Sequence, residues 1–182
     1  MRCNFSFITF SVLLQVEQES VINRIIGVGG FDASNSPEDI LKTFALGSCV
    51  AVILMDLKSR SVGMVHVALP DSSINPVKAK QFPGFFADTG IQALLKKMAA
   101  LGCPENGKGM IVKLAGGAKI MDPNNTFNIG KRNVLALKKI LWAYRMGPVA
   151  EDVGGHLSRT VSVSVDSGEI ILSTPTKSNW KL

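Results

Sequence analysis

Apolar runs of strand length recur along this chain, and each is bounded by glycine, proline or a short polar segment. Runs of this kind predict β-strands, half-buried where apolar and polar residues alternate and fully buried where they do not. Two intervening stretches are polar and contain proline, and we expect 32–39 and 70–83 to be surface loops. The strands are expected at 21–30, 43–55, 62–69, 110–115, 149–153, 159–165 and 169–173.

Two longer segments follow the helical period instead. Each carries an apolar stripe on one face, which predicts amphipathic helices over 86–101 and 128–146. Gly102 and Gly147-Pro148 are the expected stops. The stripes consist of Ile91, Leu94, Leu95, Met98 and Leu101 in the first helix and Val134, Leu137, Ile140, Leu141 and Tyr144 in the second.

The pattern as a whole describes one mixed α/β domain, with its strands mostly in hairpins and two helices packed against them. We expect this domain to span 21–174 and to be followed by a C-terminal tail at 175–182. Residues 1–20 form an apolar N-terminal extension, in which Phe5–Val16 is shorter than the roughly twenty residues of a membrane-spanning helix. No clear cleavage site follows, so we expect an extra terminal segment, or a start codon assigned too early, rather than a signal peptide.

Composition narrows the function classes. With 182 residues, 46% hydrophobic and 19% charged, the chain is long enough for one well-packed core. The formal charge of +6 comes from scattered Lys and Arg, which indicates a solvated surface and no nucleic-acid arm. Three distant cysteines, Cys3, Cys49 and Cys103, argue against a disulfide framework and favour a reducing cytoplasm without stable membrane insertion.

A thiol and an imidazole lie on neighbouring expected strands. Cys49 follows the small, flexible corner Gly47-Ser48, and His66 lies in the next apolar run. If Met55 pairs with Val62, the numbers of opposed residues sum to 117, and His66 is then a diagonal neighbour of Cys49 on the same face. Diagonal neighbours are about 7–8 Å apart at Cα, within reach of an imidazole that bends toward a thiol.

This pair suits nucleophilic catalysis. An imidazole can take the thiol proton and return it to a departing amine, and backbone N–H groups at Ser48-Cys49 can bind an oxyanion. Thr43 is an even number of residues before Cys49, so the two side chains would share one face of a straight strand. Thr43 joins the site only if Gly47 bends the chain sharply. The alternative is structural, since free cysteine and a lone histidine on an apolar strand are commonly packed in cores.

The remaining candidates are weaker. Cys103 follows a helix-ending glycine and is expected to be structural, and His156 is expected to lie in a loop. A metal site would need ligands from three cysteines and two histidines that include no close pair, so we expect no metal.

Several spaced motifs occur in one order along the chain. The strings T-F-A-L-G-S-C-V-A-V (43–52) and G-M-V-H-V-A-L-P (63–70) are followed by F-A-D (86–88), A-G-G-A (115–118), N-I-G-K-R-N (128–133) and E-D-V-G-G (151–155). Together they resemble the chemoreceptor glutamine deamidases of the CheD family. The resemblance covers residues 21–173.

The resemblance implies a cysteine hydrolase that converts glutamine side chains of chemotaxis receptors to glutamate and ammonia. By position, Cys49 would be the nucleophile, His66 the base and acid, and Thr43 the residue that orients the imidazole, with Gly47 and Ser48 in support and no cofactor. The implied fold is a layered sandwich of two mixed β-sheets flanked by helices, similar to the cytotoxic necrotizing factor toxins.

The family also implies partners, namely methyl-accepting chemotaxis receptors in the cytoplasm and a CheC-type phosphatase. Two alternatives follow. In one, the protein is mainly a binding regulator of the phosphatase with little deamidase activity. In the other, it deamidates proteins other than receptors.

Overall fold

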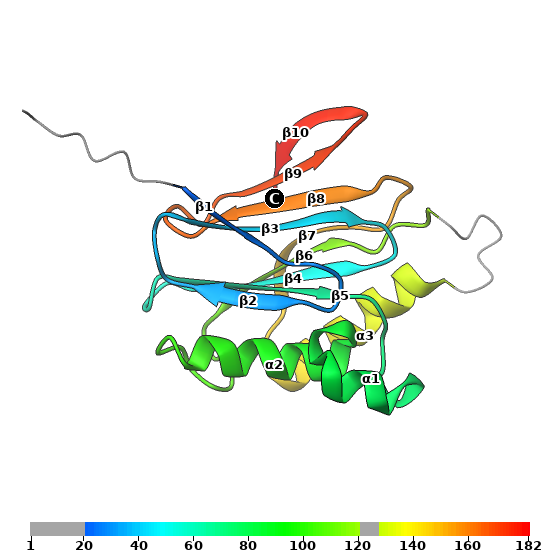
Figure 1. The fold of residues 1–182 in the computed structure, drawn as a ribbon, viewed down its shortest axis with the longest axis horizontal. Helices are drawn as coiled ribbons and strands as arrows, with labels where there is room; N and C mark the ends of the chain where they lie inside the picture. Colours follow the sequence, from blue (N-terminus) through cyan, green and yellow to red (C-terminus); the bar gives the residue numbers. More distant parts are fainter. Residues whose placement is uncertain (1–20, 121–127) are drawn as a thin grey trace, which may run out of the picture.

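Two five-stranded sheets packed face to face form the body of the protein, and helices cover one of them (Figure 1). The structure is a computed structural model that describes residues 21–120 and 128–182. Sheet A has the order β1-β3-β8-β9-β10 and sheet B the order β2-β5-β4-β6-β7. Each sheet contains one parallel pair, β1 with β3 and β6 with β7, so both sheets are mixed. The predicted sandwich of two mixed sheets with helices is confirmed.

The strands are short, as expected from apolar runs broken by turns. Those of sheet A are β1 Ile22–Ile25, β3 Asp39–Leu46, β8 Arg159–Ser164, β9 Ile170–Thr174 and β10 Lys177–Lys181. Those of sheet B are β2 Phe31–Ser34, β5 Ser61–Val67, β4 Val50–Asp56, β6 Ile111–Gly116 and β7 Pro148–Val153.

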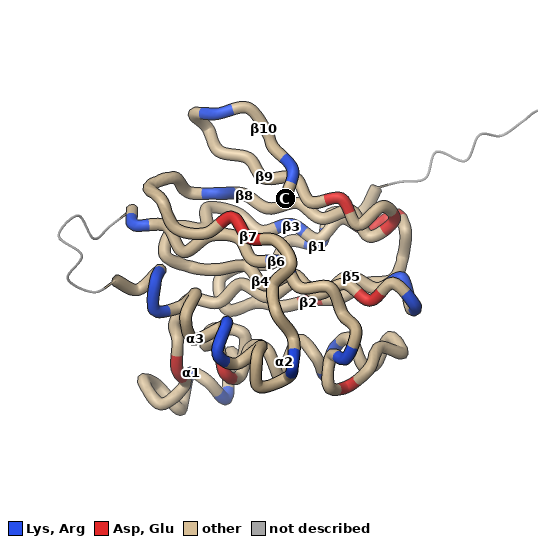
Figure 2. The backbone as a smooth tube through the Cα atoms, turned by 180° about the vertical axis from the view of Figure 1, so that it is seen from behind, with Lys and Arg blue, Asp and Glu red and all other residues tan. Residues whose placement is uncertain are grey.

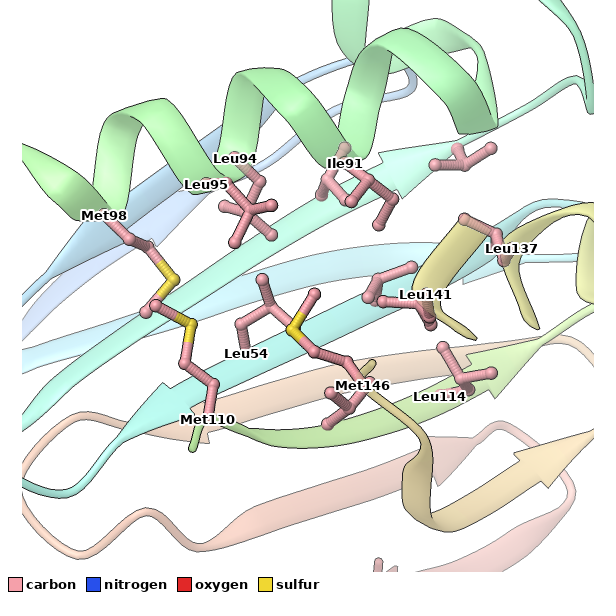
Figure 3. Packing of buried hydrophobic residues seen from close by; sticks show 14 of the residues in the cluster. Leu54, Ile91, Leu94, Leu95, Met98, Met110, Leu114, Leu137, Leu141 and Met146 are labelled. Carbon is pink, nitrogen blue, oxygen red and sulfur yellow. The ribbon is translucent and has the colours of Figure 1, made fainter. Parts of the chain in front are cut away.

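The two predicted long helices are α2, Ala87–Ala99, and α3, Ile129–Ala143. Both cover the face of sheet B that points away from sheet A (Figure 1). In Figure 3 their apolar side chains lie over Leu54 of β4 and Leu114 of β6. The stripe in α2 is confirmed, since Ile91, Leu94, Leu95 and Met98 are buried. The buried positions of α3 are Gly130, Asn133, Leu137 and Leu141, so its innermost line is shifted toward smaller and polar residues.

Strand β4 lies at the centre of the molecule, and this position explains why its sequence is apolar without interruption. Val52 and Leu54 belong to the cluster under the helices, whereas Ile53 and Met55 belong to the cluster between the sheets. A strand covered on both faces needs apolar side chains at every position. Met55 pairs with Val62 in β5, so the predicted register is confirmed.

The loops expected at 32–39 and 70–83 contain regular structure. Phe31–Ser34 pairs antiparallel with β5 as β2, the edge strand of sheet B, and its Ala33 and Ser34 are buried. The second stretch contains the short helix α1, Pro76–Gln81, and 3₁₀ turns at Ser72–Ile74 and Pro83–Phe85. Asn75 caps α1 by accepting a hydrogen bond from the Lys78 amide. The prediction of a loop from polar residues and proline did not take this capping signal into account.

The run 43–55, treated as one strand with a bend, is divided between the two sheets. Strand β3 belongs to sheet A and β4 to sheet B, and residues 47–49 connect them. Ten strands result where about seven were expected, because the run 43–55 is shared between β3 and β4 and the edge strands β2 and β10 have weak apolar patterns.

Residues 175–182, expected to form a tail, contribute β10 to sheet A. Trp180 packs partly buried against the layer between the sheets, and its Nε1 donates to Asp152 Oδ2 at 2.7 Å. Asp152 lies in β7 of sheet B, so this hydrogen bond joins the sheets. The burial of one aromatic ring and its polar contact account for a strand in a mostly polar sequence.

The boundaries proposed for a domain over 21–174 stay a prediction, and the expected extension at 1–20 lies outside the described residues. Within the described ranges, no helix is long and apolar enough to cross a bilayer. Lys and Arg are distributed over both sheets and the helices in Figure 2, as their scatter along the sequence indicates.

Trp180 provides a test of the contribution of β10. Trp180→Phe keeps an aromatic ring but loses the hydrogen bond to Asp152, and should lower the free energy of unfolding by about 1–2 kcal/mol. Trp180→Ala also loses packing and should cost about 3 kcal/mol. Urea unfolding measures both changes. The exposed neighbour variant Ser178→Ala should stay within about 0.5 kcal/mol of the wild type, and equal stability of all four proteins would contradict the assignment.

Candidate active site

The corner Gly47-Ser48-Cys49 is the point at which the chain crosses from sheet A to sheet B. The bend begins before the glycine. The register between β3 and β8 shifts between Thr43 and Leu46, and Ala45 within this bulge has a left-handed φ of 52°. The requirement that Gly47 alone bend the strand is therefore replaced by a β-bulge at Ala45 followed by an open corner.

Thr43 and His66 meet across the two sheets. Thr43 extends from β3 and His66 from β5, and both are buried, with exposed fractions of 0% and 2%. Thr43 Oγ1 and His66 Nδ1 are 2.8 Å apart, and Thr43 Oγ1 also donates to the Ile26 carbonyl oxygen at 2.6 Å. The sheet packing thus brings together two residues that no single strand could place side by side.

These two hydrogen bonds determine the histidine tautomer. A threonine hydroxyl has one hydrogen, and here it is donated to Ile26. Thr43 must therefore accept from His66, so the neutral imidazole carries its proton on Nδ1. The lone pair is then on Nε2, which is buried without a hydrogen-bond partner among the described residues.

Cys49 lies on the same side of sheet B as His66. Ala51 pairs directly with His66, and Cys49 is two residues before Ala51, so the two side chains share the face toward sheet A. Cys49 is a free, half-buried thiol packed against the cluster between the sheets. The predicted diagonal arrangement of Cys49 and His66 follows from the confirmed register, with one partly accessible sulfur and one unpartnered nitrogen.

Burial shifts the pKa of both groups toward their neutral forms. It raises the pKa of the Cys49 thiol, with a smaller opposing contribution from the residue's own amide. It lowers the pKa of His66 to about 4, against a smaller contribution from the backbone of Ile26. Near neutral pH the pair is therefore a thiol and a neutral imidazole rather than an ion pair, and the imidazole is in the form that can accept a proton.

The three carbonyl groups of the corner each accept a hydrogen bond from the segment 117–118 or from Asn133. The Ala118 amide donates to the Gly47 oxygen at 2.7 Å, and the Gly117 amide donates to the Cys49 oxygen at 2.7 Å. The Ser48 oxygen accepts from Asn133 Nδ2 at 3.0 Å. The amides of Ser48 and Cys49 donate to no carbonyl within the described part of the chain.

Glycines permit this close approach. A Cβ on Gly116, whose φ is +112°, would lie 2.3 Å from the Cys49 oxygen. A Cβ on Gly130 would lie 2.4 Å from the Gly117 oxygen. The segment 116–118 and the start of α3 therefore contact the corner only because these positions lack side chains.

Sequence reasoning selected Thr43, Gly47, Ser48, Cys49 and His66 as site residues. In the structure Thr43 contacts His66, and Cys49 lies on the same face of sheet B as His66. Sequence reasoning assigned no part to Asn133. The available signal was a polar residue among the buried positions of an otherwise apolar helix stripe.

The weaker candidates lie elsewhere. Cys103 is buried in the cluster under the helices, and its sulfur lies 3.1 Å from Ser59 Oγ, which agrees with a structural part. His156 is exposed in the loop before β8, as predicted. Among the residues that the structure describes, no three His, Cys, Asp or Glu side chains gather as metal ligands.

Comparison with known proteins places this geometry in a family. A family model described as CheD chemotactic sensory transduction matches residues 68–174. A protein of Syntrophotalea carbinolica, named a probable chemoreceptor glutamine deamidase CheD, is 52% identical over 158 residues, 87% of this chain and 98% of that protein. This chain belongs to the CheD family.

More distant CheD proteins match over similar lengths. One from Syntrophus aciditrophicus, named a probable chemoreceptor glutamine deamidase CheD 1, is 43% identical over 82% of this chain and 92% of its own. The chemoreceptor glutamine deamidase CheD of Bacillus licheniformis is 35% identical over 87% of this chain and 94% of its own. The motifs at 115–118 and 128–133, which carried the resemblance to CheD, are the segments that contact the corner.

The lowered pKa of His66 predicts a pH dependence of stability. Unfolded histidine binds a proton near pH 6.5, whereas folded His66 binds one near pH 4, so the unfolded state holds more protons between these values. The neutral imidazole therefore contributes stability above pH 6.5 that is lost as the pH falls toward 4, about 3 kcal/mol in total.

Urea unfolding at a series of pH values tests this expectation. Wild type should lose more stability than His66→Gln between pH 6.5 and 4, by up to about 3 kcal/mol. The second histidine, His156, is exposed and present in both proteins, so the comparison isolates His66. Parallel pH profiles would contradict the burial of a neutral His66.

Proposed function

We propose that this CheD chain hydrolyses glutamine side chains of chemoreceptors to glutamate and ammonia, with Cys49 as nucleophile and His66 as general base and acid. The observation that carries this proposal is the hydrogen bond between Thr43 and His66 Nδ1, which leaves the Nε2 lone pair on the face shared with Cys49. Relatives at 52% and 35% identity bear the name chemoreceptor glutamine deamidase, which supports the substrate class.

In the first half of the reaction, His66 Nε2 takes the proton from the Cys49 thiol as sulfur attacks the carboxamide carbon of glutamine. The carbonyl oxygen becomes an oxyanion, bound by the amides of Ser48 and Cys49. The imidazolium then donates its proton to the carboxamide nitrogen. The C–N bond breaks, ammonia leaves, and a thioester to Cys49 remains.

In the second half, neutral His66 takes a proton from water, and the hydroxide attacks the thioester carbon. The C–S bond breaks as the proton passes to the Cys49 sulfur, which restores the thiol and releases glutamate. Thr43 accepts from Nδ1–H throughout and stabilises the imidazolium that forms in each half. The proton cycle is complete within these three side chains and needs no cofactor.

The family resemblance supports further assignments within this proposal. The substrate glutamines lie in the cytoplasmic region of methyl-accepting receptors, so the protein acts in the cytoplasm, and a CheC-type phosphatase is a second partner. The sandwich is proposed to be akin to that of the cytotoxic necrotizing factor toxins. A pull-down in which a CheC-type phosphatase binds wild type and Cys49→Ala equally, without receptor turnover by either, would favour the regulator alternative.

The activity can be tested with a recombinant receptor cytoplasmic fragment. Wild type should release ammonia and increase the mass of the fragment by about one dalton at individual glutamines, because NH₂ is replaced by OH. Cys49→Ala should show no turnover, since no other described thiol lies near the corner. Cys103→Ala is the matched control and should retain activity. Equal turnover by Cys49→Ala would refute the cysteine mechanism.

The catalytic contribution of the Thr43 hydroxyl can be tested separately from the packing of the side chain. Thr43→Val has nearly the same shape but cannot accept from His66 Nδ1, so kcat should fall about 10–100-fold through loss of the productive tautomer. Thr43→Ser keeps the hydroxyl and should stay within about 3-fold of wild type. Steady-state kinetics on the receptor fragment measure both. A Val variant as active as the Ser variant would remove Thr43 from the mechanism.

A further inference from the structure

Asn133 is the polar exception on the buried face of α3. Its exposed fraction is 0%, and the other buried positions of the helix are Gly130, Leu137 and Leu141. Asparagine is a modest helix former, and a buried amide needs hydrogen-bond partners for all its groups. Its Oδ1 has none among the described residues. Helix packing alone would favour an apolar side chain here, so the donor group of Asn133 must account for the choice.

The donor group of Asn133 joins the two halves of the candidate site. Nδ2 donates to the Ser48 oxygen at 3.0 Å and to the Ala68 oxygen at 2.9 Å. The two carbonyl acceptors also establish which terminal atom of the amide is nitrogen. Ser48 directly precedes Cys49, and Ala68 follows His66 by two residues. One side chain therefore connects the corner of the thiol to the end of the strand that carries the imidazole.

The bond to Ser48 has a further geometric effect. The Ser48 carbonyl and the Cys49 N–H belong to one planar, trans peptide group, so they point in opposite directions. Holding the oxygen toward α3 directs the Cys49 amide to the other side. There it lies close enough to its own thiol to lower the thiol pKa slightly. In the same way, the bond from Ala118 to the Gly47 oxygen directs the Ser48 amide.

We propose that Asn133 is a positioning residue that holds the Ser48–Cys49 peptide in the orientation in which the Cys49 amide binds the oxyanion. This inference rests on the proposed deamidase function and deepens it. Without the Nδ2 donor, the peptide group is free to rotate, and its carbonyl oxygen can turn toward the developing negative charge. A donor prepared before the reaction stabilises that charge without reorganisation.

The variant Asn133→Leu tests the proposal, because leucine has as many side-chain heavy atoms as asparagine but no donor for the Ser48 and Ala68 oxygens. Leu137→Ala, one turn further along the same buried face (Figure 3), is the control for weakened packing of α3. On the receptor fragment, kcat of Asn133→Leu should fall about 10²–10³-fold with KM within about 3-fold of wild type. Leu137→Ala should keep kcat within about 3-fold despite lower stability.

Alkylation of Cys49 by iodoacetamide separates orientation of the amide from placement of the thiol. This displacement of iodide from an sp³ carbon forms no oxyanion, so its rate should differ less than about 3-fold between wild type and Asn133→Leu. An unchanged kcat in folded Asn133→Leu would overturn the proposal. A parallel loss of kcat and alkylation would also overturn it, since Asn133 would then position the thiol rather than the oxyanion donor.

A third measurement does not depend on receptor turnover. A peptide with an aldehyde in place of the glutamine carboxamide forms a thiohemiacetal with Cys49, in which an S–C bond forms and the former carbonyl oxygen takes the negative charge or the thiol proton. Asn133→Leu should bind it at least about 10-fold more weakly than wild type, and equal binding would overturn the inference. Absence of wild-type turnover would refute the proposed function alone. If Asn133→Leu does not fold, Asn133→Ala takes its place in each measurement.

Discussion

The hydrogen bond between Thr43 and His66 joins the two sheets at the place where the chain crosses between them. It lies in the buried layer between the sheets, where an unpaired imidazole or hydroxyl would be costly. Thr43 meets this demand in both directions, since it donates to Ile26 and accepts from His66. The imidazole is thereby given one orientation and one tautomer, and the contact that satisfies this buried polar pair leaves Nε2 without a proton.

Close contact between backbone segments is the second constraint. The corner at 47–49 is surrounded by β6, the residues after it and the start of α3, at distances that exclude side chains at Gly116 and Gly130. These neighbours supply donors to three consecutive carbonyl oxygens of the corner. A connection between two sheets would otherwise be exposed and irregular, but here its peptide groups have defined directions. Rigid elements thus prepare the geometry of a short loop.

Much of the fold could be predicted because the signals are local. The stripe of α2, the apolar run of β4 and the polar turn between β4 and β5 led to the observed helix, strand and register. The register in turn placed Cys49 and His66 on one face. The edge strands β2 and β10 were missed, because their pairing depends on a neighbouring strand and on single contacts such as Trp180 with Asp152 rather than on an apolar pattern.

The sequence by itself determined the residue types of the site and the shared face of Cys49 and His66, because strand parity and a short hairpin depend only on residues close in the chain. Only the tertiary structure decided how Thr43 reaches His66, since β3 and β4 lie in different sheets and the bend starts at Ala45. It also decided the position of Asn133, which is 84 residues from Cys49 in sequence and whose Nδ2 lies 3.0 Å from the Ser48 oxygen. Contacts between residues so far apart in sequence arise from the packing of the sheet and helix layers, and no local sequence pattern encodes them.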